Sequence, residues 1–358
     1  MKKIFLLCNV FIAAFCTLLT SCSEKTAKSG QVTIVYTGNI GARYDPCGCR
    51  IPLGGLARRS TAVNEIRDLE SNVIILDSGA LLYEKHRLYP PYEPVLRQQA
   101  RLMVDMLNKI GLDASNVSSM DLANSPDSLL TIDKISSWPW LSANVVWKET
   151  GNLIFQPDMI KTTGNMNVGI FGFMDQSSNG TPFFDESSPV DILDPVETAK
   201  KEVKKLKAEG VDLVVALIYM NKDDVENLIR SVPGINLAIY SHTNEHNPSS
   251  DPTFFVPYKV NDTVVARCPD GGRVVGIMKL EMWNGSTDFT NGVKYVDLRP
   301  ESVKKAEDIK DRKSNFTNVF INLDPSISRD REIQDYIDEV GGRLEASRER
   351  LKKETEKS

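Results

Sequence analysis

The sequence has 358 residues and a formal net charge of −5 at pH 7. This length fits an export signal, one α/β domain and a charged C-terminal segment. A mildly acidic chain does not offer the basic surface that nucleic acids need, so the composition excludes nucleic acid as an expected partner. After the N-terminal segment, no apolar run in the sequence is long enough to cross a bilayer.

Residues 1–21 have the pattern of an export signal. Two lysines precede an apolar run that extends to residue 19, as in a signal peptide. The run leads into Leu19-Thr20-Ser21-Cys22, which resembles the bacterial lipobox. Cleavage there would leave Cys22 as the N-terminal residue, and acylation of Cys22 would anchor the protein through lipid chains. An ordinary signal peptide followed by an incidental cysteine is the alternative.

The expected anchor implies a place in the cell envelope, on the outer membrane or on the outward face of the cytoplasmic membrane. Residues 22–30 are polar and predict a flexible tether between the anchor and the folded domain. Loss of residues 1–21 removes two lysines and no acidic residue, so the formal charge changes from −5 to −7. We therefore expect the membrane to be a partner through the N-terminal lipid.

Residues 32–80 predict a strand, a loop, a helix and a second strand. Residues 32–36 and 73–76 are short apolar runs rich in β-branched side chains, which is typical of buried parallel strands. Between them, apolar residues recur at helical spacing from Leu56 to Leu69, which favours a right-handed crossover helix. Polar residues follow each strand, and ligands bind at the carboxyl ends of strands in α/β sheets.

The middle of the chain continues this alternation of helix and strand patterns. An aromatic and proline-rich loop that contains His86 leads into an amphipathic helix at residues 95–110. We expect a single histidine in such a loop to be exposed. Residues 195–209 predict a second amphipathic helix with Asp194 as its N-cap, and residues 211–219 predict a buried strand.

The last part of the chain changes in composition. Residues 254–283 are expected to be rich in β-structure. Residues 300–358 predict a charged C-terminal extension that contains a strand at 317–323 and a long helix from about residue 328.

Three motifs near the first two strands resemble those of a known family. They are T-G-N-I-G at residues 37–41, P-L-G-G-L-A-R-R at 52–59 and L-D-S-G-A at 76–80. They are similar to T-N-D-x-H-G, G-G-x-A-R and D-A-G-D of the calcineurin-like metallophosphoesterases, in the 5'-nucleotidase branch. Further similar segments follow in the family's order to about residue 285. The resemblance to the N-terminal domain of that branch implies a four-layer α-β-β-α sandwich over residues 31–299.

The resemblance also implies a site for two divalent metals, which polarise phosphate and make hydroxide from water. Carried over position by position, one strong ligand remains, His242. The other inherited positions hold residues that bind metals weakly or not at all. They are Asn39, Gly41, Ala80, Ser119, Met120, Tyr219 and Asn244. Because hard cations need several charged oxygens and transition metals need nitrogen or thiolate, we expect no cofactor; a divalent metal is the alternative.

Three aspartates lie near these positions, and we interpret them as structural. Asp45, Asp77 and Asp121 occur in turns, where aspartate commonly caps the backbone. Asp77 belongs to the remnant pocket, since it directly follows the second predicted strand. Arg58 and Arg59, in the turn before the first helix, are expected to be solvated or paired with structural carboxylates.

Three cysteines remain after the signal and Cys22. Cys47 and Cys49 lie in the loop after the first strand, and Cys268 lies in a later loop that borders the same pocket. One hypothesis is a disulfide that joins Cys268 to Cys47 or Cys49. The other is a soft-metal site in which these thiolates combine with His242 and His246.

The sequence thus favours a lipid-anchored pseudoenzyme that uses the metallophosphoesterase fold as a binding or scaffold module. Its ligand would be a small molecule or a protein. Methionine at position 120, where the family has its catalytic acid, cannot donate a proton. Two alternatives stay open: a metal-dependent phosphoesterase of the 5'-nucleotidase type, and a remodelled metal or redox site of cysteine and histidine.

Overall fold

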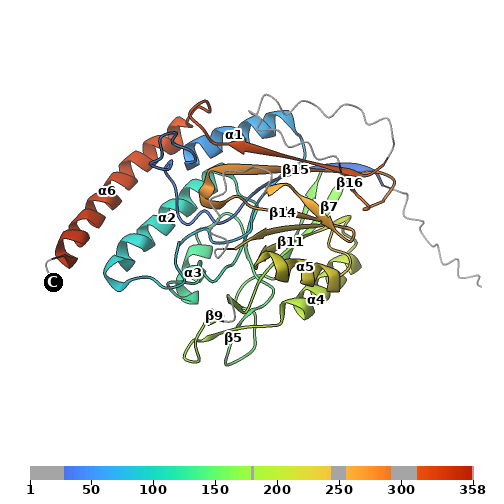
Figure 1. The fold of residues 1–358 in the computed structure, drawn as a ribbon, viewed down its shortest axis with the longest axis horizontal. Helices are drawn as coiled ribbons and strands as arrows, with labels where there is room; N and C mark the ends of the chain where they lie inside the picture. The colour runs from blue at the N-terminus through green and yellow to red at the C-terminus, as the bar shows by residue number, and fades with distance from the viewer. Residues whose placement is uncertain (1–27, 179–180, 243–254, 292–312, 357–358) are drawn as a thin grey trace, which may run out of the picture.

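The computed structural model describes residues 28–178, 181–242, 255–291 and 313–356. The expected signal and lipid anchor at Cys22 lie outside the described residues, as do Asn244 and His246. Figure 1 shows the arrangement of helices and strands in the described part. None of the helices in these ranges is long and apolar enough to cross a membrane.

The strands form two mixed sheets, and the first has seven strands in the order β16-β17-β15-β1-β2-β3-β4. Its strands in that order are Thr290–Asn291, Asn315–Asn322, Val274–Met282, Gly30–Thr37, Val73–Asp77, Ala114–Asn116 and Trp140–Leu141. Strands β1 to β4 are parallel, whereas β15 runs antiparallel to both β1 and β17. The carboxyl ends of β1 to β4 therefore lie along the same edge of the sheet, as the sequence predicts for the two strands in residues 32–80.

The second sheet has six strands in the order β13-β14-β12-β11-β7-β6. Its strands in that order are Tyr258–Val260, Thr263–Arg267, Leu237–Ser241, Leu213–Tyr219, Met166–Met174 and Asp158–Thr163. Two short pairs lie outside the sheets: β5 (Val145–Trp147) with β10 (Val190–Ile192), and β8 (Ser177–Ser178) with β9 (Thr181–Pro182).

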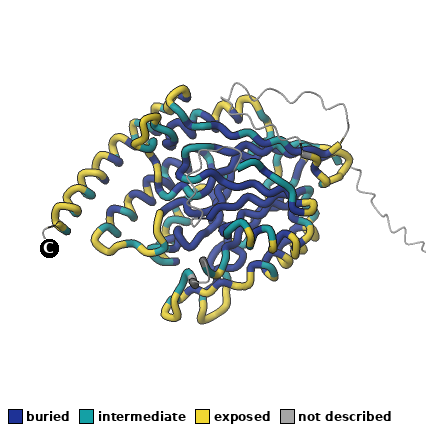
Figure 2. The backbone as a smooth tube through the Cα atoms, viewed as in Figure 1, coloured by how far each residue is buried: buried dark blue, intermediate teal, exposed yellow. Residues whose placement is uncertain are grey.

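The side chains of the strands separate the core into layers. In β1, Val32, Ile34 and Tyr36 face the second sheet, while Val35 faces the helices on the outer side. This follows from the two-residue period of a strand, which sends neighbouring side chains to opposite faces. In β7, Ile170 likewise packs between the sheets and Phe171 packs against the helices of the other face. The two sheets are therefore stacked face to face, with buried side chains between them. Most residues of both sheets have the dark blue colour of buried positions in Figure 2.

Helices cover both outer faces. Helices α1 (Leu56–Leu69), α2 (Glu93–Ile110) and α6 (Arg331–Thr355) pack together on the side of the first sheet, and α4 (Pro195–Ala208) and α5 (Lys222–Ser231) cover the second (Figure 1). Short helices in the described ranges include α3 (Pro126–Asp133), η1 (Pro90–Tyr92) and η3 (Asp270–Gly272). This arrangement confirms the predicted four-layer sandwich with a C-terminal helix.

Two helix boundaries show why the predicted limits are close to the observed ones. The side chain of Asp194 accepts a hydrogen bond from the amide of Glu197 at 2.8 Å, so Asp194 caps α4 as expected. Helix α2 ends at Gly111, which has φ of 78°. Glycine adopts this left-handed conformation without a steric penalty, which lets the chain leave the helix.

The C-terminal segment is built into the domain. Strand β17 lies between β15 and β16, and it pairs with β15 along eight residues. Ile333, Ile337 and Leu344 of α6 are buried against the helices of the first sheet. Both elements that we expected after residue 300 therefore complete the first sheet and its helical layer.

Candidate functional site

The inherited positions of the described residues meet where the parallel strands of both sheets end. Asn39 follows β1, Ala80 follows β2, Ser119 follows β3, and Tyr219 and His242 lie at the ends of β11 and β12. Backbone hydrogen bonds hold the first two loops together: Asn39 donates to Gly79 and Gly41 donates to Ala80, at 2.9 and 2.8 Å. The fold therefore gathers these residues as the sequence predicts for carboxyl ends of strands.

Asn39 connects the two sheets through its amide group. Its Nδ2 donates to the carbonyl oxygen of His242 at 3.0 Å and to Oδ1 of Asp270 at 2.7 Å. An N–H group directed at these oxygens takes the place where the family has a metal-binding carboxylate. Asn39 Oδ1 is a buried neutral oxygen that has no hydrogen-bond partner among the described residues.

Asp121 uses its carboxylate to hold the loop after β2. Its Oδ1 accepts hydrogen bonds from the amides of Leu81 and Leu82 at 2.9 and 2.8 Å, and its Oδ2 accepts from Ala80 at 3.0 Å and from the Ser118 hydroxyl at 2.6 Å. Burial raises the pKa of Asp121, although these hydrogen bonds oppose the rise. The carboxylate is occupied by the backbone, in agreement with the predicted turn-forming role.

Asp77 is also directed at neighbouring protein groups. It accepts hydrogen bonds from the Thr37 hydroxyl at 2.7 Å and from the amide of Gly79 at 2.9 Å. Asp77 is 1% exposed, and this burial raises its pKa to about 6. The two hydrogen bonds and the charge of Arg59 act in the opposite direction and lower the pKa. Arg59 itself is buried, which lowers its pKa to about 10. The burial of Arg59 contradicts the expectation that it is solvated. The nearby carboxylate of Asp77 agrees with the other expectation, that Arg59 is paired with a structural carboxylate.

His86 is not exposed, contrary to the expectation for its loop. Its Nδ1 lies 2.9 Å from Oγ of Ser119. The imidazole ring packs against the ring of Phe183, with 5.1 Å between the centroids. Burial, followed by the nearby charge of Lys85, lowers the pKa of His86, which favours its neutral form. The residue at the inherited position of a metal-binding asparagine therefore bonds to a histidine from another loop.

The contact of His86 with Phe183 starts a row of rings across the site. Phe183 packs against Tyr219 at 6.3 Å between centroids, and Tyr219 packs against His242 at 5.6 Å. We call His86, Phe183, Tyr219 and His242 the ring row. It joins the loop after β2 to the end of β12. Neither His86 nor Phe183 stands in a family motif or a periodic pattern, so no signal in the sequence indicated their part in the site.

The donor set does not fit the family's pair of metals. Each carboxylate oxygen of Asp77 and Asp121 already accepts at least one hydrogen bond from the backbone or from a hydroxyl group. Met120 is buried and offers a thioether, a poor ligand for hard cations. Within the described ranges, no group of three or more histidine, cysteine, aspartate or glutamate side chains is arranged to hold a metal ion. His242 and the neutral oxygen of Asn39 are the donors that the described part of the pocket retains.

The cysteines of the described residues are free thiols. Cys268 is completely buried between the sheets, with its Sγ 3.2 Å from Oγ of Ser78, and burial raises its pKa well above the usual value. Cys47 is half-buried and Cys49 is exposed. The structure thus does not contain the expected disulfide, and in its described part it does not gather the three thiols into a metal site.

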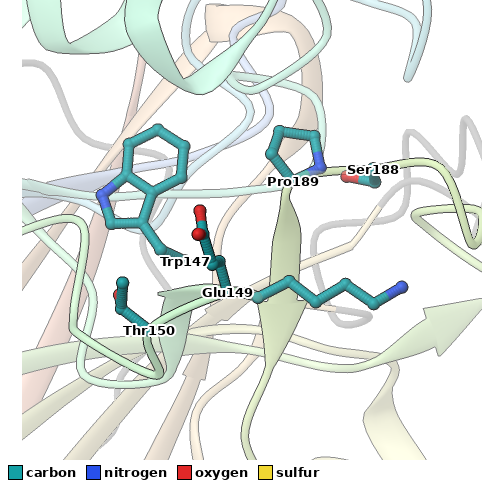
Figure 3. A pocket seen from close by; sticks show the side chains of 6 residues that line it. Trp147, Glu149, Thr150, Ser188 and Pro189 are labelled. Carbon is teal, nitrogen blue, oxygen red and sulfur yellow. The ribbon is translucent and has the colours of Figure 1, made fainter.

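A shallow groove lies apart from these residues. It has a volume of about 370 Å³ and lies beside the β5–β10 pair, and none of the inherited positions lines it. Trp147 and Thr150 lie on one side of it, and Ser188 and Pro189 lie on the other (Figure 3). We assign no function to this groove.

Curated proteins with similar sequences are 5'-nucleotidases, although no protein-family model matches the chain. The snake venom 5'-nucleotidase of Gloydius brevicauda is 26% identical over 275 residues, which cover 73% of this chain and 44% of that protein. The 5'-nucleotidase of Rattus norvegicus is 29% identical over 61% of this chain and 39% of its own length. The chain therefore spans about two fifths of the length of these curated relatives.

Two solved structures share the fold. The 5'-nucleotidase precursor from Thermus thermophilus superposes with a TM-score of 0.68 at 18% identity, over 88% of this chain and 59% of that one. The calcineurin-like phosphoesterase YfkN from Bacillus subtilis superposes with a TM-score of 0.67 at 18% identity, over 90% of this chain and 100% of that one. At this identity the similarity shows the fold alone.

Proposed function

From its place in the superfamily of calcineurin-like phosphoesterases and 5'-nucleotidase N-terminal domains, we propose that the chain is a binding module without the dimetal centre. The observation that carries this proposal is the ring row. Two inherited metal-ligand positions hold Tyr219 and Ser119. Tyr219 packs against Phe183 and His242, and Ser119 hydrogen-bonds to His86, so protein side chains occupy these positions. The fold would then serve recognition of a small molecule or a protein.

The chemistry of the remaining donors supports this proposal. A dimetal hydrolase needs a bridging carboxylate and several charged or imidazole ligands. At the bridging position Ala80 offers only its backbone, and its amide donates to Ser118 and Asp121. Restoring the carboxylate alone would leave Asn39 with its N–H group directed at Asp270, so a single reversion does not recreate the site.

The relatives favour a second candidate, a metal-dependent phosphoesterase. Those that we compared are 5'-nucleotidases, and His242 and Asn39 Oδ1 are donors that such an activity could use. Fold and distant similarity do not by themselves carry an activity. We therefore rank this candidate below the binding module on the geometry of the site.

One experiment separates the two candidates. The purified full chain is assayed with AMP and with bis(p-nitrophenyl) phosphate, in the presence of Mn²⁺, Zn²⁺ or Mg²⁺ and after chelation. The binding module predicts no turnover above that of the matched variant His242→Ala. Turnover that requires metal, stops on chelation and disappears in His242→Ala would establish the phosphoesterase instead.

We also propose that the chain is exported and lipid-anchored at Cys22 in the cell envelope. The support is the lipobox-like sequence that ends at Cys22, behind two lysines and an apolar run. Cells that express the chain are grown with an alkyne analogue of palmitate, and the membrane fraction is analysed by mass spectrometry. Incorporation that is lost in Cys22→Ser supports the anchor. Equal labelling of both proteins, or none, contradicts it.

A further inference from the structure

Cys47 and Cys49 form a pair of free thiols at the surface, apart from the ring row. Cys47 is half-buried and Cys49 is exposed. The chain bends through residues 48–51, and Gly48 is exposed with no atom within 4 Å of a Cβ built on it. Residues two apart in a bend lie close together, and this bend lies at the surface, where Gly48 and Cys49 are exposed. The two sulfurs therefore belong to one short surface loop and not to the core.

The backbone holds Cys47 more firmly than Cys49. The amide of Leu53 donates to Cys47 Sγ at 3.4 Å, and the amide of Cys47 donates to the carbonyl of Leu53 at 2.8 Å. An isolated bridge between Pro46 and Gly54 closes the same loop. A backbone N–H that points at sulfur favours the thiolate over the thiol. The loop thus presents one fixed sulfur that receives a hydrogen bond, and one exposed sulfur beside it.

Two arginine side chains, Arg273 and Arg43, lie near the pair, and Arg43 also forms an ion pair with Glu84 at 2.8 Å. The charge of Arg273 favours a lower pKa for both thiols, and the charge of Arg43 does the same for Cys49. Burial by itself would raise the pKa of Cys47, but hydrogen bonds from Cys49 and Leu53 and the charge of Arg273 lower it below its usual value. The hydrogen bond to Cys47 raises the pKa of Cys49. A partly exposed thiol in an electropositive setting is the environment of reactive cysteines.

We propose that Cys47 and Cys49 form a dithiol site that reduces disulfides, with Cys47 as the attacking thiol and Cys49 as the resolving thiol. The Cys47 thiolate attacks one sulfur of the substrate, whose S–S bond breaks as the mixed disulfide forms, and the first leaving thiolate takes up a proton. Cys49 then loses its proton and attacks Cys47 Sγ, which releases the second thiolate. One disulfide and two protein thiols give one protein disulfide and two free thiols.

This inference does not depend on the proposed function. The loop at residues 47–49 contributes nothing to the ring row, and Cys268 takes no part because it is completely buried between the sheets. The site requires only that a disulfide reaches the exposed side of the loop. Both a small disulfide and a disulfide of a protein have the necessary chemistry.

The test uses the full chain, reduced and freed of reductant. It is mixed with glutathione disulfide or with a peptide closed by one disulfide, and the reaction is stopped with acid. Peptide mapping by mass spectrometry then locates the thiols, including those outside the described residues. We expect two free thiols released for each Cys47–Cys49 disulfide formed. Reaction with either probe supports the site and indicates which kind of disulfide it accepts.

Variants separate the two roles. Cys47→Ser should slow the reaction by about 100-fold or more, because the attacking thiolate is lost. Cys49→Ser should keep the first step within about twofold and trap a stable mixed disulfide on Cys47. Arg273→Gln should slow attack by roughly threefold to tenfold at low salt, and less at high salt. The matched control Cys268→Ser should behave as the wild type.

Three results would overturn the proposal. They are separate lasting adducts on Cys47 and Cys49, equal loss of rate in the two serine variants, and a reaction no faster than that of an unstructured peptide with the same C-G-C sequence. Zinc bound by the reduced protein in a one-to-one ratio, with both thiols protected from the probes, would also contradict it.

Discussion

The site has two parts that are held in different ways: the buried carboxylates Asp77 and Asp121, and the ring row, which crosses from the loop after β2 to the end of β12. Asp77 and Asp121 accept hydrogen bonds from the loop after β2. Tyr219 and His242 belong to the ring row. One half thus uses its polar groups to fix the backbone, whereas the other half is held by the packing of rings. The two halves should therefore respond differently to substitution and to pH.

Removing the carboxylate of Asp121 should have the largest effect. Asp121→Ala leaves the buried amides of Leu81 and Leu82 without their acceptor, and we expect a loss of about 3–5 kcal/mol in the free energy of unfolding. Urea denaturation followed by circular dichroism measures it. The matched control is Asp68→Ala on the exposed face of α1, which should change stability by no more than about 0.5 kcal/mol. A loss in Asp121→Ala as small as in the control would show that this half does not depend on its carboxylates.

Opening the ring row should have the next largest effect. Tyr219 is 0% exposed, so Tyr219→Ala leaves a cavity and should destabilise the protein by about 3 kcal/mol. Phe183 is only half-buried, so Phe183→Ala should lose less. The same urea experiment compares the two variants. A loss of stability in Phe183→Ala that equals or exceeds that in Tyr219→Ala would contradict the greater burial of Tyr219.

The carboxylate half should lose stability as the pH rises. Burial raises the pKa of Asp77 from 3.8 to about 6, so its contribution is complete below the unfolded value and is lost as the pH passes through about 6. Compared with Asp77→Asn, the wild type should lose up to about 3 kcal/mol between pH 4 and pH 7. Parallel stability curves for the two proteins over this range would contradict the expected titration.

The stability that the ring row contributes should decrease as the pH falls, and this change should be smaller than that of the carboxylate half. Because the pKa of His86 is lowered, its contribution is present above the ordinary pKa of histidine and is lost as the pH falls through the folded value. Thermal unfolding of the wild type and of His86→Gln between pH 8 and pH 5 checks this. The difference between the two melting temperatures should become smaller towards pH 5, and a difference that grows would contradict a neutral, half-buried imidazole.

The sequence predicted the scaffold better than the contents of the site. The alternation of Val32, Ile34 and Tyr36 against Val35 specifies which face of β1 is buried between the sheets, because strand period and hydrophobicity act locally. The turn-forming role of Asp121 was also predictable from its place in a turn. These features depend on residues that are near one another in the chain.

The ring row could not be predicted in the same way. His86 and Phe183 meet across 97 residues, and both come from loops that carry no periodic pattern. Likewise, the sequence leaves Arg59 either solvated or paired with a structural carboxylate, and its burial depends on how α1 packs on the first sheet. Contacts of this kind arise from tertiary packing, which a single sequence does not encode in a local signal.

The most direct test is a crystal structure of the protein soaked in MnCl₂, with anomalous scattering recorded at a wavelength that identifies manganese. We expect no ordered manganese pair between the ends of β1 and β2 and the ends of β11 and β12. We also expect that His86 remains hydrogen-bonded to Ser119 and that the rings of Tyr219 and His242 remain in contact. Two manganese ions bridged in that space, with the ring row displaced, would contradict it.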